Sequence, residues 1–67
     1  MNYLEWSHEY EETVQTLDEL IQKLKKQRAA SPLNRRELSD KISYYRQCRA
    51  ECMEICNHLM ERHRGVA

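Results

Sequence analysis

Residues 31–38 read Ser-Pro-Leu-Asn-Arg-Arg-Glu-Leu, and this stretch decides the fold. Proline disfavours helical geometry at the preceding residue and lacks the backbone N–H that a helix interior needs. A helix that reaches Ser31 is therefore expected to end there. Because the pattern of a second helix starts within a few residues, the connection is short, and a short connection makes two helices antiparallel neighbours.

The second helix has two candidate starting points within this stretch. In the first, Asn34 is the N-cap, Glu37 completes a capping box, and Leu33 packs against Leu38 as a hydrophobic staple. In the second, the serine of the Ser-Pro pair is the cap and the proline is the first helical residue. Both starts are compatible with a helix over residues 35–64.

Before the turn, apolar side chains recur at alternating intervals of three and four residues, which is the repeat of a helix with one buried stripe. Val14 and Ile21 lie one position after stripe residues and widen the stripe, which suits a helical bundle better than a two-stranded coiled coil. Asn2 is placed to cap the start. The pattern predicts a helix over residues 3–29 with the stripe Tyr3, Trp6, Tyr10, Thr13, Leu17, Leu20 and Leu24.

After the turn, the same spacing predicts the stripe Leu38, Ile42, Tyr45, Arg49, Cys52, Cys56, Leu59 and His63. Arg49 interrupts this stripe with a charge. It can extend its charged end to solvent, pair with a glutamate of a partner, or point outward while Cys48 takes the core position, and we expect the last arrangement. Gly65 is expected to end the helix.

Folding the chain about residue 33 places the two stripes opposite each other. Leu24 then faces Ile42, and large side chains such as Tyr10 face small cysteines, which fills a core without voids. The sequence therefore predicts an all-α protein of one domain, residues 1–67, folded as an antiparallel two-helix hairpin. The residues expected in its core and dimer interface are Trp6, Tyr10, Val14, Leu17, Ile21, Leu24, Ile42, Tyr45, Cys52, Cys56 and Leu59.

The hairpin is expected to pair with a second copy of itself. Below roughly 70–80 residues, a single core rarely supplies more than a few kcal/mol of stability, and each helix of a hairpin leaves one side of its stripe in water. Dimerisation into a four-helix bundle covers that side. The 33 % of charged residues suit the remaining, solvated helix faces.

Cys48, Cys52 and Cys56 recur at every fourth residue along the second helix. With one of the histidines they could form a zinc site, since thiolate and imidazole suit that ion. Alternatively they pack as small apolar side chains beneath large residues of the first helix, and this is the interpretation that we favour. An odd number of cysteines argues against a disulfide framework, so we expect reduced thiols and no cofactor.

Catalysis and membrane insertion lack support in the sequence. Cys56 and His63, a candidate nucleophile and base, are two helical turns or about 10 Å apart along the axis, which is too far for catalysis. No apolar run approaches the ~20 residues of a membrane span, and the N-terminus has no secretory signal. We therefore expect a cytoplasmic protein that is not an enzyme.

The formal net charge is zero, yet the charges are unevenly distributed. Residues 1–21 carry six acidic and no basic side chains, whereas residues 22–49 carry nine basic and two acidic ones. A basic cluster around the turn could bind nucleic-acid phosphates or lie against the acidic first turns of a partner subunit, and the overall neutrality favours the second. The members of this basic cluster are Lys23, Lys25, Lys26, Arg28, Arg35, Arg36 and Lys41.

The stretch Asn34-Arg35-Arg36-Glu37-Leu38-Ser39-Asp40-Lys41-Ile42, followed by aromatic and small residues, resembles the second helix of short uncharacterised helical open reading frames in phages and integrative elements of Gram-positive anaerobes. The similarity covers about half of the chain and carries over no functional residue. Length and topology are similar to those of the plasmid-copy-control Rop proteins, which are dimeric helical hairpins that bind paired RNA. The residues do not match those of Rop, so this second resemblance is one of architecture.

The sequence thus predicts a small interaction or structural module that acts as a homodimeric helical bundle. The alternative is a nucleic-acid-binding regulator that uses the basic cluster in the manner of Rop. Neither function needs a cofactor or a membrane.

Overall fold

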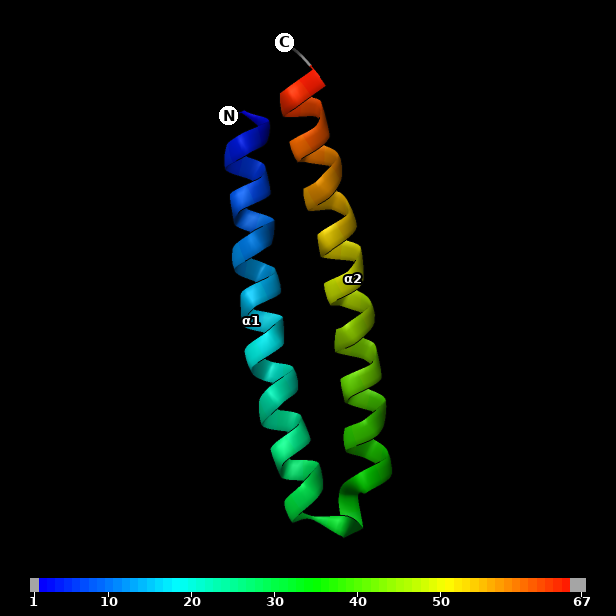
Figure 1. The fold of residues 1–67 in the computed structure, drawn as a ribbon. Helices are drawn as coiled ribbons and strands as arrows, with labels where there is room; N and C mark the ends of the chain where they lie inside the picture. Colours follow the sequence, from blue (N-terminus) through cyan, green and yellow to red (C-terminus); the bar gives the residue numbers. More distant parts are fainter. Residues whose placement is uncertain (1, 66–67) are drawn as a thin grey trace.

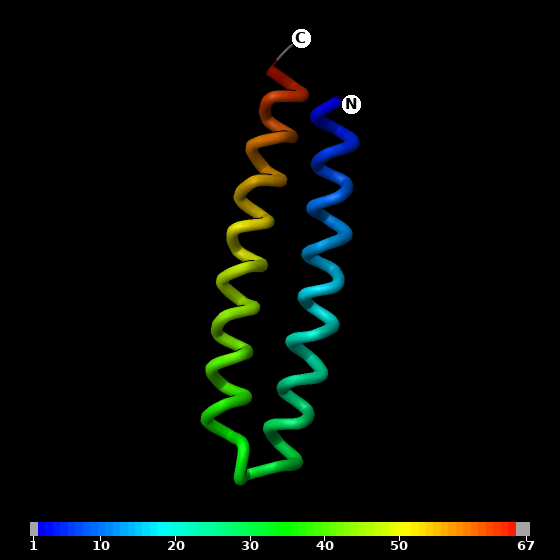
Figure 2. The backbone as a smooth tube through the Cα atoms, turned by 180° about the vertical axis from the view of Figure 1, so that it is seen from behind, coloured from blue at the N-terminus to red at the C-terminus, as the bar shows by residue number. Residues whose placement is uncertain are grey.

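The computed structural model describes residues 2–65, which form two long helices joined by one short turn (Figure 1). Helix α1 is Tyr3–Ala30, the 3₁₀ turn η1 is Pro32–Asn34, and helix α2 is Arg35–Gly65. The helices run antiparallel and side by side along their length, so the start of α1 and the end of α2 lie together at the end opposite the turn (Figures 1 and 2). The predicted two-helix hairpin is confirmed, and each helix boundary agrees within one residue.

The start of α1 is capped as predicted. Asn2 lies in extended geometry, and its Oδ1 accepts a hydrogen bond from the Glu5 N–H at 2.8 Å. The Asn2 carbonyl accepts another from the Trp6 N–H at 3.2 Å. This cap satisfies a backbone donor that has no partner within the helix.

The turn between the helices is short and has 3₁₀ geometry, which leaves no room for the predicted hydrophobic staple. Pro32 opens η1, the Asn34 N–H donates to the Ser31 carbonyl at 3.4 Å, and η1 runs directly into α2. Helix α2 itself begins at Arg35, the residue after Asn34, as in the first predicted start, whereas the Ser-Pro pair begins η1 without a capping hydrogen bond from the serine side chain. The predicted staple is wrong: Leu33 is 97 % exposed while Leu38 is buried. Because η1 reverses the chain within one turn, its middle residue points away from both helices.

Contacts across the hairpin fix its register. Near the turn, Arg28 of α1 donates to the Ser39 hydroxyl of α2 at 3.2 Å. Near the chain ends, the Ser7 hydroxyl contacts the Met60 sulfur, also at 3.2 Å. Both pairs are centred midway between residues 33 and 34, so the predicted fold about residue 33 is confirmed to within one residue.

The buried core has two parts with a gap between them. Near the turn it is aliphatic and contains Ile21, Leu24, Leu38 and Ile42, with Leu20 and Tyr45 packed against it. Toward the chain ends it contains the smaller set Ser7, Val14, Cys56 and Leu59. Between Ile42 and Cys56, α2 buries no residue. The middle of the hairpin is therefore only partly covered by its own side chains.

Helix α1 is rotated by one position relative to the predicted stripe. Ser7 is 0 % exposed whereas Trp6 is 43 % exposed, so residue 7 rather than residue 6 faces α2. The rotation buries Val14 and Ile21, whose aliphatic side chains gain more from leaving water than a threonine in the stripe would. Ser7 tolerates burial because its hydroxyl donates to the Leu4 carbonyl at 2.7 Å.

The hairpin is narrow, with Cα extents of 54 × 14 × 14 Å. Such a body has one line of core between its helices and no second layer. Each helix therefore exposes a flank on either side of that line, and the two flanks differ in chemistry. Within the described residues, neither helix is sufficiently long and apolar to cross a membrane.

Candidate interaction surface

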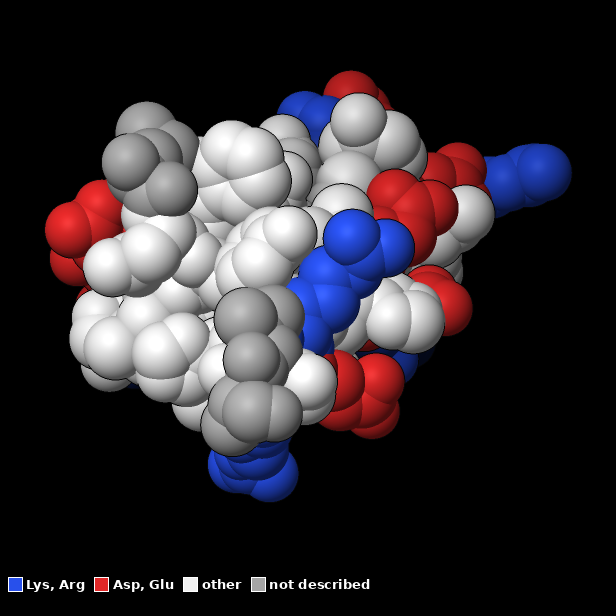
Figure 3. Space-filling view, turned by 90° about the horizontal axis from the view of Figure 1, so that it is seen from above, with Lys and Arg blue, Asp and Glu red and all other residues white. Residues whose placement is uncertain are grey.

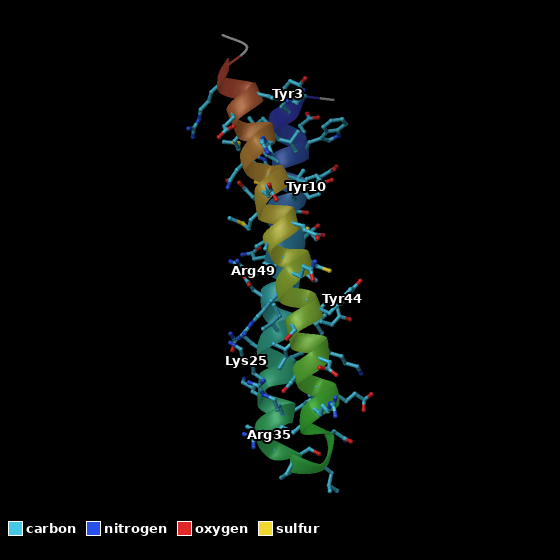
Figure 4. All side chains as sticks on the ribbon, turned by 90° about the vertical axis from the view of Figure 1, so that its right-hand side faces the viewer. Tyr3, Tyr10, Lys25, Arg35, Tyr44 and Arg49 are labelled. Carbon is cyan, nitrogen blue, oxygen red and sulfur yellow. The ribbon has the colours of Figure 1, made fainter. Side chains whose placement is uncertain are left out.

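One flank of the hairpin carries large apolar side chains that remain in contact with water. Trp6 is 43 %, Ile55 is 40 % and Tyr44 is 63 % exposed. Figure 4 shows Tyr10 and Tyr44 on this same side of the helix pair. We call this flank the open face. Because residues seven apart share one side of a helix, we assign to it Trp6, Tyr10, Leu17 and Leu20 from α1 and Tyr44, Tyr45, Cys48, Cys52 and Ile55 from α2.

A groove of ≈ 340 Å³ hollows the open face toward the chain ends, and it is lined by Trp6, Glu9, Tyr10, Thr13, Ile55 and Leu59. Cys48 and Cys52 lie seven residues, or two helical turns, before Ile55 and Leu59. Residues seven apart lie on the same side of a helix. The open face therefore continues from this groove into the middle of the hairpin, where the core is thinnest.

The opposite flank is charged. Figure 4 shows Lys25, Arg35 and Arg49 on the side away from Tyr10 and Tyr44. Seen from the end where the termini lie, uncharged side chains gather mainly on the α1 side of this end, and many of the visible acidic and basic side chains lie on the α2 side (Figure 3). The flank opposite the open face thus carries more charge, although Met53 and Met60 also lie beside Glu11 away from the open face.

Arg49 links the two helices on the charged flank. Its Nε donates to the Asp18 carboxylate of α1, and the two side chains are 40 % and 48 % exposed. The expectation that Arg49 points outward, away from the helix pair, is therefore wrong. An arginine stem can cover apolar surface while its head stays hydrated, and here the head also finds an acidic partner within the chain.

The three cysteines are free thiols in two different environments. Cys56 is 5 % exposed, and its thiol donates to the Ser7 carbonyl at 3.5 Å and contacts the Glu11 carboxylate at 4.0 Å. Burial, and then the charge of Glu11, raises the pKa of the Cys56 thiol. Cys48 and Cys52 are half-buried on the open face. The packing interpretation therefore describes Cys56 better than the other two.

No metal centre is formed within a single hairpin over residues 2–65, because no three side chains among the His, Cys, Asp and Glu residues come together there. Near the open cysteines, the hydrogen bond between Tyr44 and Cys48, followed by the charge of that sulfur, raises the pKa of the Tyr44 hydroxyl. The Tyr44 ring also meets the Tyr45 ring edge-on, with centroids 5.3 Å apart.

The structure distributes the predicted interface residues between the core and the open face. Buried between the helices are Val14, Ile21, Leu24, Ile42, Cys56 and Leu59. Half-buried are Tyr10, Leu17, Tyr45 and Cys52, and Trp6 is exposed. Sequence reasoning left Ser7 out of the core. The seven-residue interval that links it to Val14 and Ile21 is the signal that identifies it.

The seven residues of the basic cluster come from the end of α1 and the start of α2, on either side of η1. Lys25 and Arg28 are half-buried and the other five are exposed. Arg28 donates to Ser39 as described above, and Lys41 lies 3.9 Å from the Glu37 carboxylate one turn earlier. The cluster is therefore a solvated basic tip.

Comparisons with protein-family models, with curated proteins and with solved structures found no match to this chain. The resemblances to phage-type helical reading frames and to Rop stay predictions.

Proposed function

We propose that this protein is a self-associating interaction module, in which two hairpins pair through their open faces to form a four-helix bundle. The supporting observation is the open face itself, a flank that leaves Trp6, Tyr44 and Ile55 partly in water on a chain with little core. Contiguous exposed apolar surface rimmed by polar residues is typical of a protein-binding site. Aromatic side chains are also enriched at such interfaces.

Pairing supplies what the single hairpin lacks. Complete burial of a large apolar side chain contributes about 1.5–3 kcal/mol, and the open face offers several such side chains from each copy. The pairing also covers the middle of the hairpin, where α2 buries nothing between Ile42 and Cys56. The module is therefore expected to be most stable as a dimer.

The charge distribution favours antiparallel pairing of the two hairpins. The first half of α1 is acidic and the second half is basic. In an antiparallel pair centred on Leu17, the acidic first half of one α1 lies level with the basic second half of the α1 of the second copy. A parallel pair would place acidic halves together and basic halves together. Juxtaposed like charges disfavour an interface, whereas complementary charges orient it.

The single tryptophan reports on this pairing directly, because Trp6 is exposed in one hairpin and covered in the proposed dimer. Dilution from micromolar to nanomolar concentration should shift its fluorescence toward the red as the dimer dissociates. Sedimentation velocity at the higher concentration should give the mass of two chains. A monomer mass at every concentration, with unchanged fluorescence, contradicts the proposal.

Two substitutions test whether the open face carries the pairing. Ile55→Ser should raise the dissociation constant at least tenfold, which corresponds to about 1.4 kcal/mol, with little loss of helicity because the side chain is already 40 % exposed in one hairpin. Leu33→Ser is the matched control, since it removes an even more exposed apolar side chain from the turn. It should leave the dissociation constant unchanged.

Nucleic-acid binding through the basic tip is the second candidate. The observation in its favour is the exposure of Lys23, Lys26, Arg35, Arg36 and Lys41 around one end of the hairpin. Base stacking has little support there, because Tyr44 is the nearest exposed aromatic and its ring is packed against Tyr45. Binding of this kind would be dominated by phosphate contacts and would fall steeply with salt.

A further inference from the structure

Cys48 and Cys52 occupy the centre of the open face. Helix α2 runs over Arg35–Gly65, so Ala50 is its middle residue. The two cysteines lie two residues on either side of it, each about 3 Å along the axis from that midpoint. Both are half-buried free thiols, and they lie where the single hairpin has no buried α2 residue.

Antiparallel pairing brings the cysteines of two copies together. When the hairpins overlap end to end, which buries the most surface, the two-fold axis crosses α2 at Ala50. Each α2 helix then packs against its counterpart, with Cys48 level with Cys52 of the second copy and Cys52 level with its Cys48. The four sulfur atoms therefore lie around the axis where the two α2 helices pack together, midway along the bundle.

We infer that these four thiols, two from each copy, form an interfacial site for a Zn²⁺ ion. The inference depends on the proposed pairing, because a single hairpin contributes only two of the ligands. Structural zinc sites are tetrahedral, commonly use four cysteines, and place them in pairs separated by two to four residues. Cys48 and Cys52 are separated by three residues. One turn of helix thus supplies half of such a site, and the symmetry supplies the other half.

The surroundings suit this role. Tyr44 lies one helical turn before Cys48 on the same helix, where a hydroxyl can act as a second group beside a metal ligand. On binding, each thiol gives up its proton and forms a sulfur–zinc bond of about 2.3 Å, with no change of oxidation state. Cys56 takes no part, because its thiol is buried between the helices against Ser7.

The experiment titrates the full chain, freed of metal with a chelator under reducing conditions, with Zn²⁺ and separately with Co²⁺. We expect one ion for every two chains, and with Co²⁺ the intense absorption of four sulfur ligands. The double variant Cys48→Ser/Cys52→Ser should fold but lose both signals. Cys56→Ala is the matched control, because it removes a thiol from the same helix and should retain both.

Sedimentation in chelator, run in parallel, separates this inference from the proposed function. A dimer that binds no Zn²⁺ overturns the metal site and leaves the pairing intact. One ion per chain, or equal binding by the double variant, also overturns it. Chains that stay monomeric with and without Zn²⁺ overturn both proposals, whereas a dimer strengthened by Zn²⁺ supports both.

Discussion

Asp18 and Arg49 form the one ion pair that joins α1 to α2 within residues 2–65, and it lies at the middle of the hairpin. Both side chains are nearly half exposed, at 48 % and 40 %. Water and salt screen such a pair, so its geometry contributes more to fixing the register of the two helices than to their stability. The aliphatic core near the turn carries more of the stability.

A double-mutant cycle measures the strength of this pair. The changes are Asp18→Asn, Arg49→Gln and their combination, each followed by urea unfolding at one protein concentration. We expect a coupling free energy of about 0.2–1 kcal/mol, the range of partly exposed ion pairs. A coupling of several kcal/mol would contradict the exposure of both groups and would indicate a dry interior at this level.

The core near the turn should be far more sensitive. Ile42 is 1 % exposed and packs against Ile21, Leu24 and Leu38. Ile42→Ala should therefore destabilise the protein by about 2–5 kcal/mol, the usual range for truncating a buried aliphatic residue. Leu33→Ala, at a residue that is 97 % exposed, should change the stability by less than about 0.5 kcal/mol. Similar thermal midpoints for the two variants would contradict the assigned core.

The contrast between buried Ile42 and exposed Leu33 shows which features of the fold could be predicted from the sequence. The position of the turn follows from proline chemistry, and the register follows from two stripes that overlap in one way. Local rules also suggested a staple at Leu33. They failed because the 3₁₀ geometry of the turn, which no pattern in the residues specifies, points that side chain outward.

The rotation of α1 was also beyond the sequence pattern. Two stripes one position apart compete on this helix, one with Trp6 and the other with Ser7. Only the packing partners on α2 decide between them: the small gap beside Cys56 and Met60 fits a serine that satisfies its own hydroxyl. The orientation of Arg49 also depends on a contact between the helices, since its partner Asp18 is 31 residues away in the chain. The sequence therefore predicted which apolar residues belong to the candidate site. It did not predict which of them lie between the two helices and which lie on the open face.

The raised pKa of Cys56 predicts a loss of stability in alkali. Its pKa in the hairpin lies above the ordinary value of 9.0, because burial and then Glu11 disfavour the thiolate. The folded state thus holds this proton more tightly than the unfolded chain does. The contribution of the Cys56 thiol to the free energy of unfolding is fully present below pH 9. It is lost as the pH rises through the higher pKa that this thiol has in the folded protein. Thermal midpoints above pH 9 should fall faster for the parent than for Cys56→Ala. If the thermal midpoints of the parent and of Cys56→Ala fall equally with pH, Cys56 is not the group responsible.

Disulfide trapping tests the orientation of the proposed dimer. Two Cys56→Ala chains are needed, one that keeps only Cys48 and one that keeps only Cys52. Antiparallel pairing places these two cysteines level across the axis, so oxidation of the mixture by copper-phenanthroline should trap mainly the mixed dimer. Parallel pairing places each cysteine beside its own copy, so each chain alone would cross-link efficiently. Non-reducing electrophoresis with two chains of different tagged length distinguishes these outcomes.

The response to salt decides between the two candidate functions. In an antiparallel dimer, the basic tip lies beside the acidic first turns of the second copy, and salt should weaken dimerisation. Exposed pairs are individually worth about 0.2–1 kcal/mol, so the effect should be modest and cumulative. Nucleic-acid binding would instead leave the dimer insensitive to salt while the affinity for nucleic acid falls steeply with it.

Replacing Lys25, Lys26, Arg35 and Arg36 with Gln tests this directly. We expect the dissociation constant of the dimer to rise and its salt dependence to flatten, with no tight binding of mixed RNA and DNA by either parent or variant. Leu33→Gln is the control, since it alters the same tip without changing its charge. If the parent binds nucleic acid tightly and salt-sensitively, and the charge variant loses that binding with its dimer intact, the basic tip is the functional site and self-association is its scaffold.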